Sequence, residues 1–119
     1  MSNIFIVDDS DTNLATAEEA LEDHYDVMTM SSAAKMFELL EKITPNLILL
    51  DIEMPEMNGF EALEKLKKNT GLAKIPVIFL TGTLDDAIKN KGLGMGAVDM
   101  ISKPFSIPIL LEKIKAQIK

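Results

Sequence analysis

Short apolar runs and helical patterns alternate along this chain. Three runs, at residues 3–7, 46–50 and 76–80, are almost continuously apolar and rich in branched side chains, which is typical of parallel strands buried on both faces. Two further runs, at 26–30 and 98–102, alternate polar and apolar residues, which is typical of strands at a sheet edge. The pattern therefore predicts five strands, with the two alternating ones outside.

Apolar residues at helical spacing follow each of these runs. The first helix should end near residue 23, and Ser31 or Ser32 should cap the second. The third should span 59–70 with Gly71 as its stop, and the fourth should begin near Leu84. The clearest apolar faces are expected at positions 14, 17 and 21, at 33, 36, 37, 40 and 43, at 60, 63 and 66, and at 107, 110, 111, 114 and 118.

Five strand–helix units in this order predict one α/β domain over residues 1–119. A five-stranded parallel sheet with helices on both faces would bury the three continuous runs. The strand order 2-1-3-4-5 places the alternating strands at the edges and permits right-handed crossovers. This is the flavodoxin-like arrangement, in which ligands bind at the carboxyl ends of the strands.

Charge and composition limit the classes of partner. The net charge is −7, and the twelve positive residues are all lysines, so bidentate recognition of phosphates or bases is poorly served and direct nucleic-acid binding is not expected. Cysteine is absent, which excludes disulfides and thiolate metal sites. The sequence contains neither a signal peptide nor an apolar run long enough for a membrane span, so no membrane partner is expected.

Three acidic residues should meet at one edge of this sheet. Asp8 and Asp9 follow the first strand, and Asp51 follows the third, which the predicted order makes its neighbour. Carboxylates about 4 Å apart repel one another by a few kcal/mol at an effective dielectric near 20, so they need a cation or raised pKa values. Oxygen ligands with room for water suit Mg²⁺.

Two further polar residues end at the same edge. Thr81 follows the fourth strand and Lys103 follows the fifth. A carboxylate nucleophile, a metal, a hydroxyl donor and an ammonium are the parts required for phosphoryl transfer. Each residue also has a structural explanation: an aspartate within 8–11 could cap the first helix, Asp51 or Thr81 could belong to a turn, and Lys103 could be solvated. Their joint placement at one edge favours function.

At these positions the chain resembles the receiver domain of bacterial two-component response regulators. The matching motifs are Asp8-Asp9, the stretch 51–59 (DIEMPEMNG), Thr81, and Lys103-Pro104-Phe105. The resemblance covers essentially the whole chain and implies a cytoplasmic phosphorelay protein. It also implies a cis peptide bond between Lys103 and Pro104.

The resemblance assigns a role to each site residue. Asp51 would accept a phosphoryl group from a sensor histidine kinase or a histidine phosphotransfer protein. Mg²⁺, or Mn²⁺, would be held by Asp9, by Asp8 mostly through water, by Asp51, and by the backbone carbonyl of Glu53. Lys103 would pair with the phosphoryl group. The chain would not be an enzyme in the usual sense, because it would catalyse only its own phosphorylation and dephosphorylation.

The resemblance also implies a switch that reads out phosphorylation. Thr81 would move to bond the phosphoryl group. Independently of the resemblance, Glu53 and Thr83 each lie two residues past a site residue, so we expect both to flank the phosphoryl group and to tune its lifetime. The family usually has Tyr or Phe three residues before the lysine, and Met100 stands there. Methionine is unbranched and adapts to irregular gaps. We therefore expect only a small free-energy difference between the two conformations of the switch, with both Met100 rotamers populated before phosphorylation.

Glycines 92, 94 and 96 should make the end of the fourth helix the most mobile part of the output face. That face would comprise the fourth helix, the fifth strand and the fifth helix, acting on a downstream output domain or target protein. The domain would be a monomer or a phosphorylation-dependent dimer. The segment 103–114 (KPFSIPILLEKI) resembles receivers attached to cyclic-di-GMP enzymes.

Two alternative functions remain open on the sequence alone. A degenerate receiver would have the same fold but act as an unphosphorylated interaction module. Residues 9–11 (DSD) also resemble the DxD motif of haloacid-dehalogenase-type phosphatases, in which Asp9 would be the nucleophile. A dinucleotide or flavin site is disfavoured, because the first turn has no G-x-G-x-x-G and its acidic residues would repel phosphate.

Overall fold

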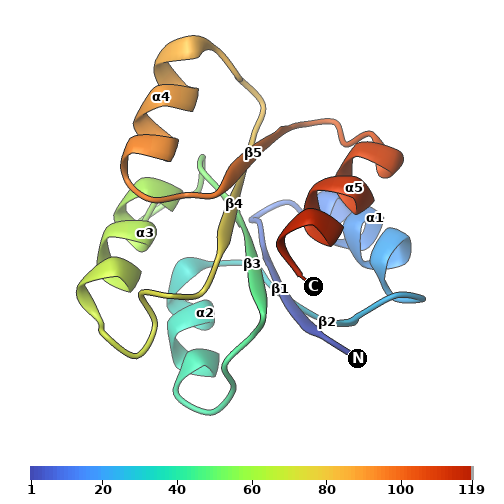
Figure 1. The fold of residues 1–119 in the computed structure, drawn as a ribbon, viewed down its shortest axis with the longest axis horizontal. Helices are drawn as coiled ribbons and strands as arrows, with labels where there is room; N and C mark the ends of the chain where they lie inside the picture. The colour runs from blue at the N-terminus through green and yellow to red at the C-terminus, as the bar shows by residue number, and fades with distance from the viewer. Residues whose placement is uncertain (119) are drawn as a thin grey trace.

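The structure, a computed structural model, describes residues 1–118 and shows strands and helices alternating along the chain (Figure 1). All neighbouring strands are parallel, in the order β2-β1-β3-β4-β5, as predicted. The strands are β1 (Asn3–Val7), β2 (Asp26–Met30), β3 (Leu47–Asp51), β4 (Val77–Thr81) and β5 (Asp99–Ser102). The helices are α1 (Asp11–Leu21), α2 (Ala33–Leu40), α3 (Gly59–Lys68), α4 (Asp86–Gly94) and α5 (Ile107–Gln117).

Two buried strands run one residue later than predicted. Asp51 is the last residue of β3, where it pairs with Leu80, and Thr81 is the last residue of β4, where it pairs with Ser102. Both polar residues are therefore held by the sheet ladder rather than by the loops that follow. This placement fixes their backbones more firmly than the sequence pattern indicated.

Three predicted helix boundaries need correction. The third helix ends at Lys68, because Asn69 is extended, and Gly71 lies in the following turn instead of stopping the helix. The fourth begins two residues after Leu84, because the side chain of Asp85 accepts a hydrogen bond from the Ile88 amide and caps it. The first ends slightly earlier than residue 23. None of the helices formed by residues 1–118 combines the length and apolar character needed to cross a bilayer.

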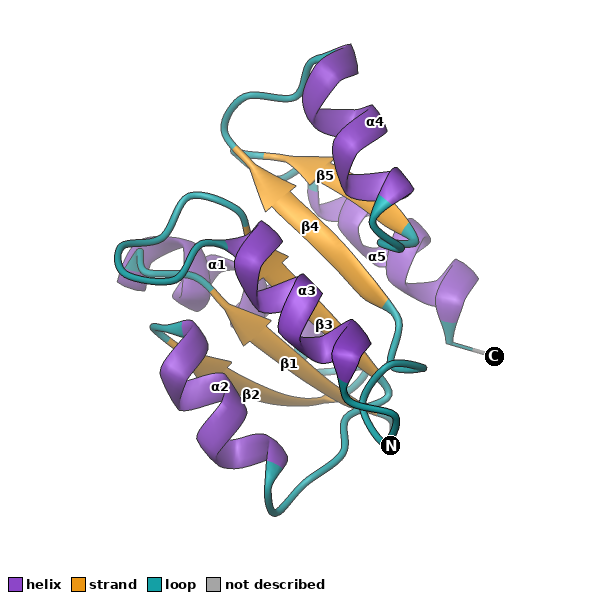
Figure 2. Ribbon diagram, turned by 90° about the vertical axis from the view of Figure 1, so that its left-hand side faces the viewer, coloured by secondary structure: helices purple, strands orange, loops and turns teal. Residues whose placement is uncertain are grey.

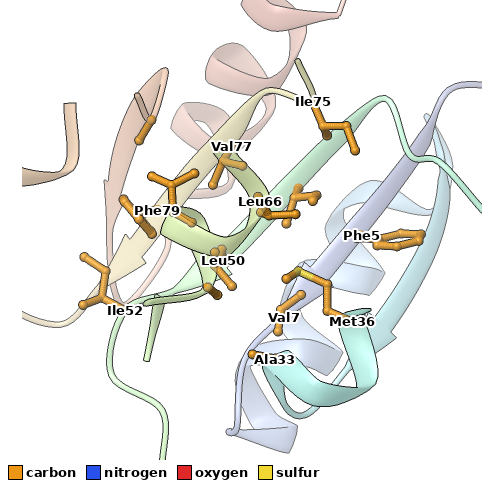
Figure 3. Packing of buried hydrophobic residues seen from close by; sticks show 14 of the residues in the cluster. Phe5, Val7, Ala33, Met36, Leu50, Ile52, Leu66, Ile75, Val77 and Phe79 are labelled. Carbon is orange, nitrogen blue, oxygen red and sulfur yellow. The ribbon is translucent and has the colours of Figure 1, made fainter. Parts of the chain in front are cut away.

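The sheet separates two apolar clusters, because successive residues of a strand point to opposite faces. In β1, Phe5 and Val7 face α2 and α3, whereas Ile4 and Ile6 face α1 and α5. Figure 2 shows α2, α3 and α4 on one face of the sheet and α1 and α5 behind it. Figure 3 shows the first cluster, which includes Phe79 from β4, Leu66 from α3 and Val7 from β1. With both faces covered, the carboxyl edge is where polar residues of the central strands gather.

Candidate functional site

The end of β1 presents one buried and one exposed carboxylate. Asp8 is fully buried: its Oδ1 accepts a hydrogen bond from the Ser10 amide at 2.9 Å, and its Oδ2 accepts one from Asn13 Nδ2 at 3.3 Å. Asp9 is exposed. Ser10, rather than an aspartate, caps α1 by accepting from the Asn13 amide. Neither Asp8 nor Asp9 caps α1, so the capping explanation considered above does not account for them.

The loop after β3 is folded tightly against the strand end. The backbone N–H of Gly59 donates to the Ile52 carbonyl at 2.9 Å, and a Cβ on Gly59 would lie 2.5 Å from the Asp51 carbonyl oxygen. Only glycine permits this approach. Asn58 then caps α3 through a reciprocal capping box with Glu61. The rigid start of α3 therefore supports the backbone of Asp51 directly.

Carboxylates from both strands converge as predicted. Asp8, Asp9 and Asp51 each place an oxygen within 4.8 Å of the others, in an arrangement that could hold a metal ion. Lys103 reaches into the same site from beyond β5: its Nζ lies 2.8 Å from Asp51 Oδ1 and 3.5 Å from Asp8 Oδ2. One ammonium against three carboxylates leaves the cluster net negative, so it favours a cation.

Burial makes Asp51 a weaker acid than an ordinary aspartate. The Asp51 side chain is 0% exposed, and this burial, together with the charge of Asp8, raises its pKa from 3.8 to about 7 against the opposing hydrogen bond from Lys103. Burial by itself would lower the pKa of Lys103, but its contacts with Asp51 and the charges of Asp8 and Glu53 raise it overall. Lys103 is therefore a permanent cation beside a carboxylate that is costly to ionise.

The two carboxylate oxygens of Asp51 differ in their hydrogen bonding. Within residues 1–118, Asp51 Oδ2 is buried and has no hydrogen-bond partner, although Oδ1 is bonded to Lys103. A buried carboxylate oxygen without a partner is costly and marks a place where a ligand or cation fits. Together with the carboxylate donor set, this observation fits a small divalent cation such as Mg²⁺.

Thr81 is turned toward Glu53 in this structure. The Thr81 side chain is buried, and its Oγ1 lies 3.0 Å from Glu53 Oε1 and 3.0 Å from the Thr83 carbonyl oxygen. The Thr83 amide donates back to Thr81 Oγ1 at 3.1 Å. Glu53 and Thr83 are thus both at the site, as their spacing predicted, and they contact Thr81 in particular.

The Met100 side chain is buried in this structure. It is 3% exposed and belongs to the cluster under α2, α3 and α4. A Cβ on Gly92 of α4 would lie 2.9 Å from Met100 Sδ, so the glycine makes room for the thioether. The Lys103–Pro104 peptide bond is cis, as the resemblance implied.

Two residues that contact the site were missed in the sequence. Asn13 donates to Asp8, and Gly92 accommodates Met100. A polar residue on the first turn of α1 was a signal for Asn13, since that turn faces the end of β1. Gly92 offered no signal of its own, because only the packed structure pairs it with Met100.

Comparison with known proteins agrees with this geometry. The family model for the response regulator receiver domain matches residues 4–115. The chain is 35% identical to Protein PilH of Pseudomonas aeruginosa over 98% of this chain and 97% of that protein. It is 39% identical to a probable cyclic di-GMP phosphodiesterase of Vibrio cholerae, of which it spans only 26%.

Solved structures share the fold over the same extent. The chemotaxis protein CheY4 of Vibrio cholerae superposes with a TM-score of 0.93 at 26% identity, covering 99% of each chain. The receiver domain of a signal transduction histidine kinase from Syntrophus aciditrophicus gives 0.89 at 32% identity, over 98% of this chain and 89% of that one. The chain belongs to the response regulator receiver domain family.

Proposed function

We propose that Asp51 is the phosphoryl acceptor of this receiver domain. The observation that carries the proposal is the environment of one carboxylate: Asp51 is buried, bonded to Lys103 through Oδ1, and without a partner for Oδ2 within residues 1–118. The free oxygen would attack the phosphorus of a phosphohistidine. A new O–P bond forms, the N–P bond breaks, and the histidine nitrogen keeps the electron pair and takes up a proton.

Lys103 supplies the charge that this transfer needs. Phosphoryl transfer depends mainly on positioning and on neutralising charge at the phosphoryl oxygens. Lys103 Nζ already lies 2.8 Å from Asp51, so the ammonium can move from the carboxylate to a phosphoryl oxygen with little rearrangement. The Thr81 hydroxyl would donate a hydrogen bond to another of these oxygens. Both residues would therefore stabilise the phosphorylated form as well as the transfer.

The donor set fits Mg²⁺, or Mn²⁺, as the metal cofactor. Asp9 would bind it directly, Asp8 mostly through water, and Asp51 and the backbone carbonyl of Glu53 would complete the protein ligands. When bound, the ion offsets the charge of the carboxylates and of the phosphoryl oxygens. Asn13 would keep the Asp8 carboxylate oriented toward this position, since its amide bonds one oxygen.

Partners and output follow from the same assignment. The donor would be a sensor histidine kinase or a histidine phosphotransfer protein, and the domain would catalyse only its own phosphorylation and dephosphorylation. Glu53 and Thr83 would tune the phosphoryl lifetime, and Thr81 with Met100 would couple the site to the surface of α4, β5 and α5. That surface would act on an output domain or a target protein in the cytoplasm of a bacterium, as a monomer or a phosphorylation-dependent dimer.

The direct test uses a small phosphodonor. Acetyl phosphate with Mg²⁺ should add one phosphoryl group, seen by intact-mass spectrometry, and chelation should suppress it. Asp51→Asn should abolish the adduct, whereas the matched control Asp26→Asn, at the exposed start of β2, should leave it unchanged. Phosphate mapped to Asp9 would instead indicate the phosphatase alternative. A folded wild type that takes up no phosphoryl group would indicate the degenerate receiver.

A further inference from the structure

The hydroxyl of Thr81 has one proton and two acceptors within reach. Glu53 Oε1 and the Thr83 carbonyl oxygen each lie 3.0 Å from Thr81 Oγ1. Only one of them can receive the proton at a time, and the carboxylate is the charged one. Hydrogen bonds to ionised acceptors are roughly twice as strong as neutral ones. Glu53 is therefore the stronger competitor for the Thr81 proton in this structure.

This hydrogen bond connects two different elements at the site. Glu53 lies in the loop after β3, and Thr81 ends β4, 28 residues further along the chain. Thr81 is buried, whereas Glu53 is exposed, so the loop side chain reaches inward to the strand. Within residues 1–118, Thr81 donates no hydrogen bond to Asp51. The Thr81 hydroxyl therefore points to acceptors other than Asp51.

We propose that Glu53 is a latch that holds Thr81 in this orientation until Asp51 is phosphorylated. The inference rests on the proposed role of Asp51. A phosphoryl group on Asp51 brings new charged acceptors to the site and, being negative, repels the Glu53 carboxylate. Both effects favour transfer of the Thr81 hydrogen bond from Glu53 to the phosphoryl group. Glu53 is thus a positioning residue, which acts through Thr81.

The latch sets how readily the unphosphorylated protein switches. An interaction made only in one conformation shifts the equilibrium toward that conformation. Loss of the Glu53–Thr81 bond should therefore raise the population in which Thr81 faces Asp51, and it should tighten binding of a phosphoryl mimic. The Thr83 carbonyl remains as a neutral acceptor, so the shift is limited. We expect about a three- to tenfold gain in affinity.

Three substitutions distinguish the effect of the Glu53–Thr81 hydrogen bond from the general effect of negative charge in this loop. Glu53→Asp keeps the charge but shortens the side chain by one methylene, so that it no longer reaches Thr81. Glu53→Gln keeps the length but offers only a neutral acceptor. Glu56→Gln removes a carboxylate from the same exposed loop, at a residue that makes no hydrogen bond to Thr81, and serves as the matched control.

Beryllofluoride with Mg²⁺ is the phosphoryl mimic, and methyl NMR of Thr81 reports its binding. Glu53→Asp should bind about three- to tenfold more tightly than wild type, Glu53→Gln should also bind more tightly, and Glu56→Gln should change affinity less than twofold. If Glu53→Asp binds like wild type while both glutamine variants bind more tightly, then general charge controls affinity and the latch is overturned. Adding Thr81→Ala should remove the difference between Glu53 and Asp at position 53.

A measurement without ligand separates the latch from the proposed function. The χ1 angle of Thr81, obtained from NMR couplings in chelator, should change in Glu53→Asp and stay as in wild type in Glu56→Gln. An unchanged χ1 overturns the latch whether or not Asp51 is phosphorylated. Failure of folded wild type to bind beryllofluoride, with χ1 still sensitive to Glu53, would instead overturn the role of Asp51 and leave the hydrogen bond in place.

Discussion

Helices α3 and α4 cover the same face of the sheet but are attached to it very differently (Figure 2). Four residues of α3 are buried, and its first residue, Gly59, packs directly on the backbone of Asp51. It also has a capping box at one end and three lysines in its last turn, which suits the helix dipole. Gly92 is the one residue of α4 that is buried, and Leu93 is 39% exposed.

The weaker attachment of α4 relies on a few contacts. Gly92 packs on Met100, and Lys91 Nζ lies 4.3 Å from the centre of the Phe60 ring, which itself stacks edge-on against Phe79. A helix held by a buried glycine, the partly buried Ile88 and one cation–π contact opens more easily than one anchored by buried leucines. The comparison indicates a rigid half that positions the phosphoryl chemistry and a looser half next to β5 that can respond to it.

Leucine truncation should expose this difference most strongly. Leu63→Ala in α3 should lower the free energy of unfolding by about 2–5 kcal/mol, because it leaves a cavity in a fully buried position. Leu93→Ala in α4 makes the same chemical change at an exposed position and should stay within about 0.5 kcal/mol. Urea denaturation of both variants measures the two losses. Comparable losses would show that α4 is anchored as firmly as α3.

The rigid half should also show a pH-dependent stability that comes from Asp51. Its native pKa of about 7 lies above the ordinary 3.8, so the protonated form favours the native state. This contribution is fully present below pH 4 and is lost as the pH rises through 7. In chelator, Asp51→Asn should therefore be more stable than wild type at pH 8, by about 1 kcal/mol or more.

The gain from Asp51→Asn should shrink as the pH falls toward 4, where wild-type Asp51 is also neutral. Mg²⁺ should stabilise wild type more than Asp51→Asn, since the variant lacks one carboxylate ligand. Asp9→Asn is the matched control: Asp9 is exposed, so relief of repulsion there should be smaller. Thermal melts across this pH range make the comparison. A less stable Asp51→Asn at pH 8 would contradict a strained carboxylate cluster.

The sequence predicted the placement of the carboxylates better than the hydrogen bonds within the site, for a physical reason. Continuous and alternating apolar runs identify buried and edge strands, and parallel topology then brings Asp8, Asp9 and Asp51 to one edge. Hydrogen bonds such as that from Thr81 to Glu53 depend on rotamers across elements that are distant in sequence. No local pattern specifies such rotamers, so the sequence placed Glu53 near the site without revealing its partner.

Local competition between residues explains the mistaken boundaries. Gly71 was the expected stop of α3, but Asn69 leaves the helix first, and its Oδ1 accepts the Gly71 amide at 2.9 Å. Leu84 was the expected start of α4, but Asp85 provides a better cap. In both cases a short polar side chain satisfies backbone groups, and such caps outweigh the apolar pattern by a small free energy.

The smallest expected effect concerns Gly92, the buried residue of α4. Alanine at an exposed helical glycine normally stabilises a protein by about 0.5–1 kcal/mol. Gly94→Ala meets no atom within 4 Å and should show part of this gain, since Gly94 is the last residue of α4. Gly92→Ala would place a methyl group 2.9 Å from Met100 Sδ and 3.1 Å from Phe79, so the clash should offset the gain.

Methyl NMR then shows where the clash is relieved. Because the methionine side chain is flexible, it should move before the Phe79 ring or the sheet does. The Met100 methyl signal should therefore shift in Gly92→Ala and remain in place in Gly94→Ala, without loss of beryllofluoride binding in either. If Gly92→Ala gains as much stability as Gly94→Ala and leaves the Met100 signal unchanged, α4 yields instead of Met100. The looser half would then respond through movement of the whole helix, and the side chain at position 100 would not be the element that reads out the site.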